Sequence, residues 1–598
     1  MQCRLSKTAM ESFCGDVLPL YLISDADLSH RDIRWSVDRD CVGVRSFAGD
    51  ESTAVAHCAL LTFRKPGSAV VTAELDGKQY HCRVSVGERK SAGSDDELQY
   101  FVGDMHDHTA MTHDPAAFAE KNCEFPIDMI EQIKQEGIFD FSVISDHSDV
   151  TNARDFFRGF TDTEAAQPME LVMFPGSESE VTFIEDDRLG LPHKNSGEIV
   201  CLNADNFVSA HTWQEFYDAL ATSSHAVCIL AHPQVVGWDK NGIWDFCLHK
   251  NNTPRLRELV KGVELGNGGD RGSNSLHEYM YSVALDNGFR VSCTCASDSH
   301  GPVWGAKAMP GRTVIMAGEK SREAFLDALL NCRFYACESG NLKVRYSVNG
   351  QTAPADLKLT ERYDFIVETS QFHEDPDSVP VKCQVISDFG ETLMTVENAD
   401  FRSFAFTVES GSARYFYLRF VDAFGRKTWT MPVWTGRECT AAPEEELTPI
   451  CSDGFVVTES GCDAAVLMNG DPSCYWTSGK EMADLVIDMR KVHRICALGH
   501  YAPRLMMRRL KEAGLEVHQV VSHFSNAYRL SVSSDGVDYT PVASGIFRRF
   551  GSEEMIRFPV CDARYIRLQV LSTTGKACEL PQYADFDVHI GELTVFAP

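Results

Sequence analysis

The stretch FVGDMHDH at residues 101–108 joins an apolar, strand-like run to a pair of histidines. Other fragments of the chain share this order, with histidine, aspartate or glutamate at the carboxyl end of a short apolar run. The carboxyl ends of parallel strands meet at one edge, where α/β barrels carry their active sites. The pattern therefore predicts a barrel with a polymetal site at one end. The other fragments are FSVISDH (141–147), VMFPGSE (172–178), LPHKN (191–195), VCILAHP (227–233) and VSCTCASDSH (291–300).

The spacing of the polar residues fits metal binding. His106 and His108 are two apart, which places both side chains on one face of an extended strand, and Asp298 and His300 repeat the spacing. Two imidazoles on one face can bind one cation. Glu178, just after a Pro-Gly turn, is a candidate carboxylate to bridge two ions. Imidazole with carboxylate suits Zn, Mn or Fe, and the sequence does not choose among them.

Residues 96–339 alternate apolar strand-like runs with amphipathic stretches, which predicts an α/β domain with a mainly parallel sheet. Helices are expected at 127–137, 212–223 and 321–331. Cys293 and Cys295 lie inside an apolar run and are expected to be buried core thiols.

The flanking regions are predicted to be all-β. Residues 1–95 contain short alternating runs broken by turns and resemble a bacterial immunoglobulin-like domain, with Trp35 as a core residue. Residues 340–440 have the size and turn spacing of a small β-sandwich.

Residues 441–598 form a last β module. Its segments MNGDPSCYWTS (468–478), RYIRL (564–568) and GELTVF (591–596) follow one another in order, with an Asp-Gly turn at 535–536. Together they resemble the discoidin, or F5/8 type C, family. That resemblance implies a carbohydrate or surface partner, by analogy at the level of the fold.

Composition limits the classes of partner. The 598 residues carry a formal net charge of −30, which argues against nucleic acid, because that recognition depends on Lys and Arg. No apolar stretch approaches the roughly 20 residues needed to span a bilayer. The 21 cysteines lack CxxC spacing, and no signal peptide is evident, so a cytoplasmic protein is expected. Removal of a leader would make it a secreted one. The sequence carries no signal for an oligomeric state.

The ordered set GDMHDH, SDH, PGSE, H-x-N, AHP and SDSH resembles the PHP family, the polymerase and histidinol phosphatase superfamily, over roughly residues 98–338. This resemblance implies a distorted seven-stranded (β/α) barrel that carries two or three divalent metal ions. It also implies the ligands. They are His106, His108, Glu178 and Asp298 for the first ion, Glu178, His193 and His232 for the second, and His113, His147 and His300 for the third.

The implied function is hydrolysis of a phosphate ester by a metal-bridging hydroxide, so the expected partner is a small phosphorylated substrate, carbohydrate-linked esters included. A cation beside the metals would complete the site, and Arg271 and Arg154 are the candidates, because Arg can bind phosphate with two parallel hydrogen bonds. Two alternatives stay open. The same site could hydrolyse a carboxylic or carbamate ester, or the chain could be a non-catalytic protein that binds carbohydrate or another surface.

Overall fold

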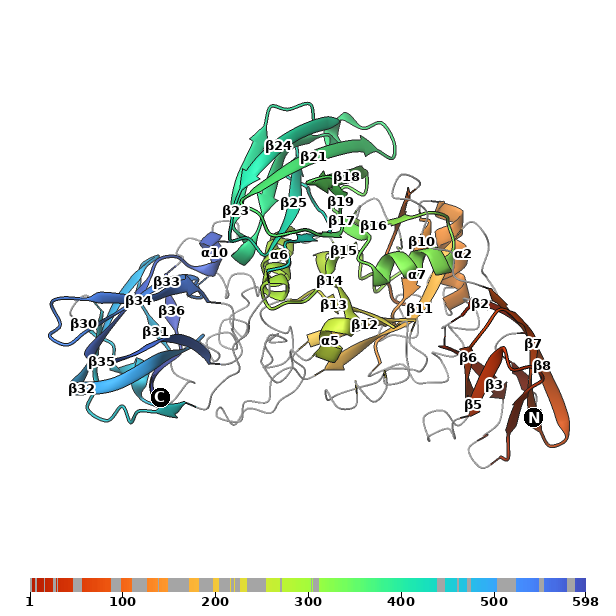
Figure 1. Ribbon diagram of the computed structural model, residues 1–598, viewed down its shortest axis with the longest axis horizontal. Helices are drawn as coiled ribbons and strands as arrows, with labels where there is room; N and C mark the ends of the chain where they lie inside the picture. The colour runs from red at the N-terminus through yellow and green to blue at the C-terminus, as the bar shows by residue number, and fades with distance from the viewer. Residues whose placement is uncertain are drawn as a thin grey trace.

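Figure 1 shows the computed structural model, with the N-terminal strands in red, the site-bearing region in orange to green and the C-terminal strands in blue. It is mostly β. Among the helices it describes, none is long and apolar enough to cross a membrane. The described residues are 3–5, 8–14, 17–24, 28, 31–46, 56–87, 98–109, 126–137, 139–148, 171–181, 197–203, 216, 220, 226–233, 254–268, 271–302, 304, 311–437, 447–459, 462–470, 475–502, 523–547, 553–577 and 587–598.

The N-terminal region consists of two four-stranded sheets that share one core. The strand β7 shows why: its residues alternate between buried and partly exposed, so one face of the sheet is apolar. Trp35 lies half-buried beside this core, and its indole N–H donates to His57 Nδ1 at 3.0 Å. The sheets are β1 (Cys3–Leu5), β3 (Val17–Ser24), β6 (Ala56–Phe63) and β5 (Val42–Ser46), and β2 (Ala9–Phe13), β8 (Lys78–Gly87), β7 (Gly67–Leu75) and β4 (Arg34–Val37).

A row of strands from β9 to β15 carries the candidate site, and each strand pairs with its neighbours in chain order. The ends of the row meet, because Asp107 beyond β9 and Ser299 beyond β15 form a parallel backbone bridge. We call this closed arrangement the strand ring. Its members are β9 (Gln99–Gly103), β10 (Phe141–Ile144), β11 (Val172–Val181), β12 (Gly197–Leu202), β13 (Val227–Ala231), β14 (Val260–Asn267) and β15 (Ser292–Ala296).

The strands of the ring run in one direction except for β12, which pairs antiparallel with both β11 and β13. The mainly parallel arrangement predicted from the sequence is therefore present in the ring, whereas the reversal of β12 was not predicted. The strands β10, β13 and β15 are buried along their whole length because both faces are covered, and the polar side chains among them are small hydroxyls such as Ser142 and Thr294.

Helices connect several of these strands. The helices expected at 127–137 and 321–331 are confirmed as α2 (Pro126–Glu136) and α7 (Arg322–Leu330). The Ser321 hydroxyl caps α7 by accepting from the Ala324 N–H at 3.2 Å. Two more helices, α5 (Pro254–Leu259) and α6 (Arg271–Asp286), flank β14. Most of the helix expected at 212–223 lies outside the described residues.

The sheet of the ring continues into a small β-sandwich, because β16 pairs antiparallel with β9 and then with β17. A second sheet faces these strands across an apolar core that includes Tyr346, Phe365 and Phe416. The first sheet continues through β16 (Arg312–Ala317), β17 (Phe334–Cys337), β26 (Lys427–Trp429), β25 (Tyr415–Asp422), β22 (Pro380–Ile386) and β23 (Thr392–Glu397). The second contains β19 (Gln351–Thr352), β18 (Leu342–Val348), β21 (Arg362–Gln371) and β24 (Ser403–Glu409).

The C-terminal region is a further β domain with its own core. Its largest sheet places the long strands β32 and β35 side by side, and a two-stranded sheet of β31 and β36 lies apart from it. Trp476 is partly buried and packs against the core. The strands are β28 (Thr448–Pro449), β37 (Glu592–Ala597), β32 (Ala483–Tyr501), β35 (Glu554–Val570), β33 (Ala527–Ser533) and β34 (Thr540–Ile546), with β29 (Val456–Glu459) beside β32 and β30 (Cys462–Asp463) beside β29, and β31 (Trp476–Thr477) with β36 (His589–Ile590).

Buried polar side chains of helix α6 contact both the β-sandwich and the C-terminal domain. Glu278 forms ion pairs with Arg419 at 2.7 Å and with Lys427 at 3.4 Å, and it accepts from the Tyr417 hydroxyl at 3.2 Å. One residue further, the Tyr279 hydroxyl donates to the carbonyl of Phe547 in the C-terminal domain at 2.5 Å. Burial alone would raise the pKa of Glu278, but the charges of Arg419 and Lys427 outweigh it and lower the pKa.

The substitution Glu278→Ala is expected to lower the free energy of unfolding by about 3 kcal/mol, because it removes the carboxylate that pairs with two largely buried cations, Arg419 and Lys427. The folded protein holds the Glu278 proton less tightly than the unfolded chain, so this stabilisation is complete above the unfolded pKa of about 4.3 and is lost as the pH falls through the folded pKa. Urea unfolding at pH 7 and pH 4 measures both effects. The control is Asp400→Ala, which removes an exposed carboxylate beside Arg402. Equal stability of Glu278→Ala and the wild type would contradict this account.

Candidate metal centre

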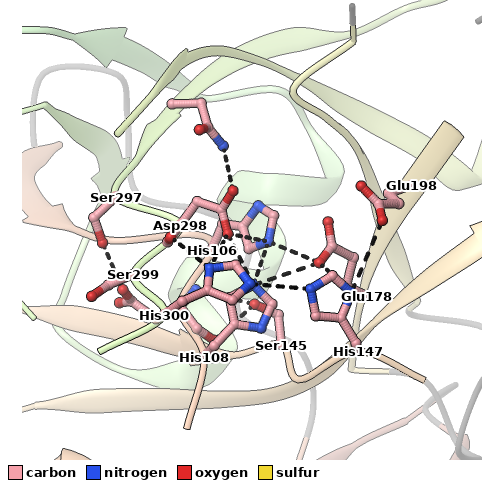
Figure 2. Close-up of polar contacts among 12 residues, drawn as sticks. His106, His108, Ser145, His147, Glu178, Glu198, Ser297, Asp298, Ser299 and His300 are labelled. Carbon is pink, nitrogen blue, oxygen red and sulfur yellow. Dashed lines mark hydrogen bonds and ion pairs between the residues drawn. The ribbon is translucent and has the colours of Figure 1, made fainter. Parts of the chain in front are cut away.

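Candidate metal ligands gather at the carboxyl edge of the strand ring (Figure 2). Most of them directly follow a strand, as the sequence pattern predicts, whereas Glu178 lies within β11. The groups brought together are His106 and His108 after β9, His147 after β10, Glu178 in β11, His232 after β13, and Asp298 and His300 after β15.

Backbone hydrogen bonds between these strand ends fix the arrangement. The Asp298 N–H donates to the carbonyl of His106 at 2.9 Å, and the His108 N–H donates to that of Ser299 at 3.3 Å. His147 and Glu178 are joined by a parallel bridge. His232 and Asp298 have positive φ angles of 25° and 48°, which is a strained conformation for residues other than glycine. Such strain persists where the surroundings enforce it, and functional sites are where it concentrates.

The Glu178 carboxylate lies at the centre of the group and is fully buried. Its Oε1 lies 3.1 Å from His232 Nε2. Its Oε2 lies 3.3 Å from His106 Nε2, 3.5 Å from His108 Nε2 and 3.2 Å from His147 Nδ1, yet none of the described residues donates a well-formed hydrogen bond to it. A buried oxygen that faces three imidazole nitrogens without a well-formed hydrogen bond fits a carboxylate that shares cations with them.

Imidazole nitrogens also face one another. His106 Nε2 and His108 Nε2 are 3.1 Å apart, and His147 Nε2 and His300 Nε2 are 3.2 Å apart. Asp298 Oδ1 lies 3.0 Å from His108 Nε2. Several overlapping trios have ligand atoms that all lie within 4.8 Å of one another, among them His106, His108 and Glu178, and His108, His147 and His300. The donor set therefore fits more than one divalent transition-metal ion.

The ionisable groups of the site shift one another's pKa values. Burial alone would raise the pKa of Glu178, but His106 and His147 outweigh it and hold the pKa well below its usual range. Burial alone would lower the pKa of His232, but its hydrogen bond with Glu178 and the charge of Glu198 raise it to about 10. The pKa of His108 is lowered, chiefly by burial. The fold therefore favours the ionised form of Glu178 and places its negative charge where cations would bind.

Two carboxylates that the sequence analysis did not single out belong to the site. Glu264 accepts from the His232 N–H at 2.7 Å and lies 3.3 Å from His106 Nδ1, the ring nitrogen opposite the cluster. A carboxylate on the far nitrogen of a metal-binding histidine fixes the ring and its tautomer. Glu198, on β12, lies 3.4 Å from His232 Nε2. The available signal was a lone glutamate in an apolar strand, as in KGVELGN at 261–267.

Neighbouring polar residues position the ligands. The Asn267 amide donates to Asp298 Oδ2 at 3.0 Å and to Glu264 Oε2 at 3.2 Å. The Asp146 carboxylate accepts from the backbone and the hydroxyl of Thr109, each at 2.7 Å, so it fastens the loop after β9 to that after β10. The Trp304 indole donates to the carbonyl of His108 at 2.9 Å.

The remaining predicted residues are not placed. His113, His193 and Arg154 lie outside the described residues. Arg271 is the first residue of α6, and its side chain also lies outside them. Their roles stay predictions. Cys293 and Cys295, expected to be core thiols, are buried in β15, and burial raises the pKa of Cys293 to about 12. No disulfide joins the cysteines within the described ranges.

No protein-family model matches this chain, and no curated protein matches it. Similar solved structures include CpGH89CBM32-5 from Clostridium perfringens, in complex with GalNAc-beta-1,3-galactose, at 15% identity over 25% of this chain and 100% of its own, with a TM-score of 0.20. The family 32 CBM of C. perfringens NanJ, in complex with galactose, is 17% identical over 25% of this chain and 99% of its own (TM-score 0.19). The C-terminal domain of a Bacteroides fragilis chitobiase is 17% identical over 25% and 96% (TM-score 0.18).

The substitution Glu264→Gln is expected to weaken metal binding about 10- to 100-fold, because the amide can still accept from the His232 N–H but no longer supplies a charge opposite His106. Competition with a chromophoric chelator measures the change in zinc affinity. Glu368→Gln, an exposed position on β21, is the matched control. An unchanged affinity in Glu264→Gln would show that Glu264 does not tune the site.

Proposed function

We propose that this chain is a metal-dependent phosphoesterase of the PHP family, with two or three divalent ions bound in the strand ring. The observation that carries the proposal is the convergence of His106, His108, His147, His232, His300, Glu178 and Asp298 at one edge of parallel strands. Their order along the chain is that of the PHP motifs. The closed strand ring, with most of its candidate ligands just beyond the carboxyl ends of the strands, supports the proposal, because the resemblance implies a barrel with its metals at that edge.

The residues of the site have different roles. Glu178 offers one oxygen to His232 and the other to the side of His106 and His147, so it is suited to bridge two ions. Glu264 and Asn267 hold His106 and Asp298 in place from behind. Divalent ions bound there would polarise a phosphoryl oxygen and lower the pKa of a bound water towards about 7.

The substrate is expected to approach beside His300. The side chain of His300 is 37% exposed, against 14% for His232 and 10% for His147, and those of His106 and His108 are almost fully buried. The site is therefore closed on the side of β9 and open on that of the loop after β15.

A cation distinguishes a phosphate ester from the alternative carboxylic or carbamate ester. In the transition state a phosphate ester carries more negative charge than a carboxylic or carbamate ester. A nearby guanidinium therefore stabilises the phosphate transition state more. Arg271 is the candidate, because α6 begins four residues after Asn267, which contacts Asp298. Its replacement should therefore impair hydrolysis of phosphate esters and spare that of carboxylic esters.

The zinc-, manganese- or iron-loaded protein is expected to hydrolyse small phosphate monoesters. Asp298→Asn is expected to lower kcat/KM by at least about 100-fold, because it removes a charged ligand from the metal centre. Release of inorganic phosphate from a panel of sugar, nucleoside and aryl phosphates measures the activity, with Glu368→Ala as the control. A metal-loaded protein that releases no phosphate but cleaves aryl acetates or carbamates would favour the alternative ester.

We also propose that residues 441–598 bind carbohydrate, on the strength of their sequence resemblance to the discoidin family. Binding of the full chain to a glycan array is the test, and Asp298→Asn should bind as the wild type does because the two sites are separate. Absence of binding to every glycan at millimolar concentration would reject this part of the proposal. Neither outcome of the glycan-binding test changes the hydrolase proposal.

A further inference from the structure

Away from the strand ring, two histidines and a carboxylate meet in the C-terminal domain. His589 is the first residue of β36, Asp587 precedes it by two residues, and His523 is distant in sequence. A parallel bridge joins Phe524 to His589, and the His589 N–H donates to the carbonyl of His523 at 3.0 Å. The backbone therefore fixes the two imidazoles side by side.

Both imidazoles face the same carboxylate. His523 Nδ1 lies 2.7 Å from Asp587 Oδ1, and His589 Nε2 lies 2.9 Å from Asp587 Oδ2. The rings are stacked, with centroids 4.5 Å apart and planes 7° from parallel. One ligand atom from each of the three residues lies within 4.8 Å of the other two. We call this trio the His–Asp–His cluster.

The surroundings hold the cluster in one orientation. The Thr477 hydroxyl donates to Asp587 Oδ2, and Thr477 is opposite His589 in the pairing of β31 with β36. The Val588 N–H donates to the hydroxyl of Ser478 at 3.1 Å. A carboxylate fixed by a hydroxyl donor is oriented before any ion arrives, which reduces the entropy lost on binding.

The cluster is sheltered but reachable. The side chains of His523, Asp587 and His589 are 18%, 19% and 8% exposed. An ion can therefore enter from solvent, and a water can complete its coordination. This differs from the buried His106 and His108, and the cluster shares no residue with the strand ring.

The ligand types select the ion. Calcium and magnesium prefer oxygen ligands, whereas two imidazoles with one carboxylate form a common three-residue set for zinc. A tetrahedral zinc with bonds of about 2.1 Å keeps its ligand atoms roughly 3.4 Å apart. The two histidine–carboxylate separations, 2.7 and 2.9 Å, are shorter than this and involve different oxygens of Asp587, so the imidazoles would move away from the carboxylate to admit the ion. One ligand atom from each residue already lies within 4.8 Å of the other two, so rotation of the side chains suffices.

We propose that His523, Asp587 and His589 bind one Zn²⁺ ion, with water at the fourth position, independently of the ions in the strand ring. The ion would link the segment at 523–524 to β36 and stabilise the C-terminal domain, because a ligand that binds only the folded state shifts the equilibrium towards it. Zinc should therefore raise the Tm of that domain.

The test counts zinc per chain in the full-length protein after removal of metal with a chelator and equilibration with ZnCl₂. His523→Ala and Asp587→Asn are each expected to bind one zinc fewer than the wild type. His493→Ala, a histidine of β32 in the same domain, should bind the same number as the wild type. Glu178→Ala, which disrupts the strand-ring site, should still bind the zinc of the cluster.

Wild-type zinc content in both His523→Ala and Asp587→Asn would overturn the proposal and show that the cluster is a metal-free hydrogen-bonded trio. Circular dichroism identifies a variant that fails to fold, and Asp587→Asn keeps the shape of the side chain. Should neither variant fold, His523→Gln decides: one zinc fewer than the wild type supports the cluster, and wild-type zinc content overturns it. Loss of zinc from Glu178→Ala but not from Asp587→Asn would leave the hydrolase proposal standing alone.

Discussion

The site depends on the contacts between the buried carboxylate of Glu178 and the imidazoles around it. Glu178 lies on the strand whose first half pairs with β10 and whose second half pairs with β12. This double pairing brings the carboxylate among imidazoles from β9, β10 and β13. A buried charge of this kind is tolerated only when opposite charges or cations surround it. The closed strand ring, the strained backbone at His232 and Asp298, and the contacts of Glu264 all help to hold those partners in place.

Much of the site could be predicted from the sequence, because its ligands stand in a fixed relation to local patterns. His106 and His108 are one strand period apart, and Asp298 with His300 repeats that spacing after another apolar run. Each strand end carries its own signal, so the direction of the strands predicts that the ligands meet. The helices α2 and α7 were predictable for the same reason, since their apolar periodicity is local.

The rest depends on contacts between residues that are far apart in the chain. Glu264 reaches His106 across 158 positions, and a single glutamate in an apolar strand has no local partner to reveal its role. The reversal of β12 is another such feature, because its short apolar run suits either direction and pairing with β11 and β13 decides. The trio of His523, Asp587 and His589 also forms only when β36 lies beside residue 524.

Diffraction from crystals of the protein grown with zinc, manganese or iron, measured above the absorption edge of that metal, tests the central claim most directly. The account predicts two or three anomalous peaks between Glu178 and Asp298, within bonding distance of His106, His108, His147 and His232. An anomalous map with no peak in the strand ring, from a crystal grown in the presence of the metal, would contradict the account.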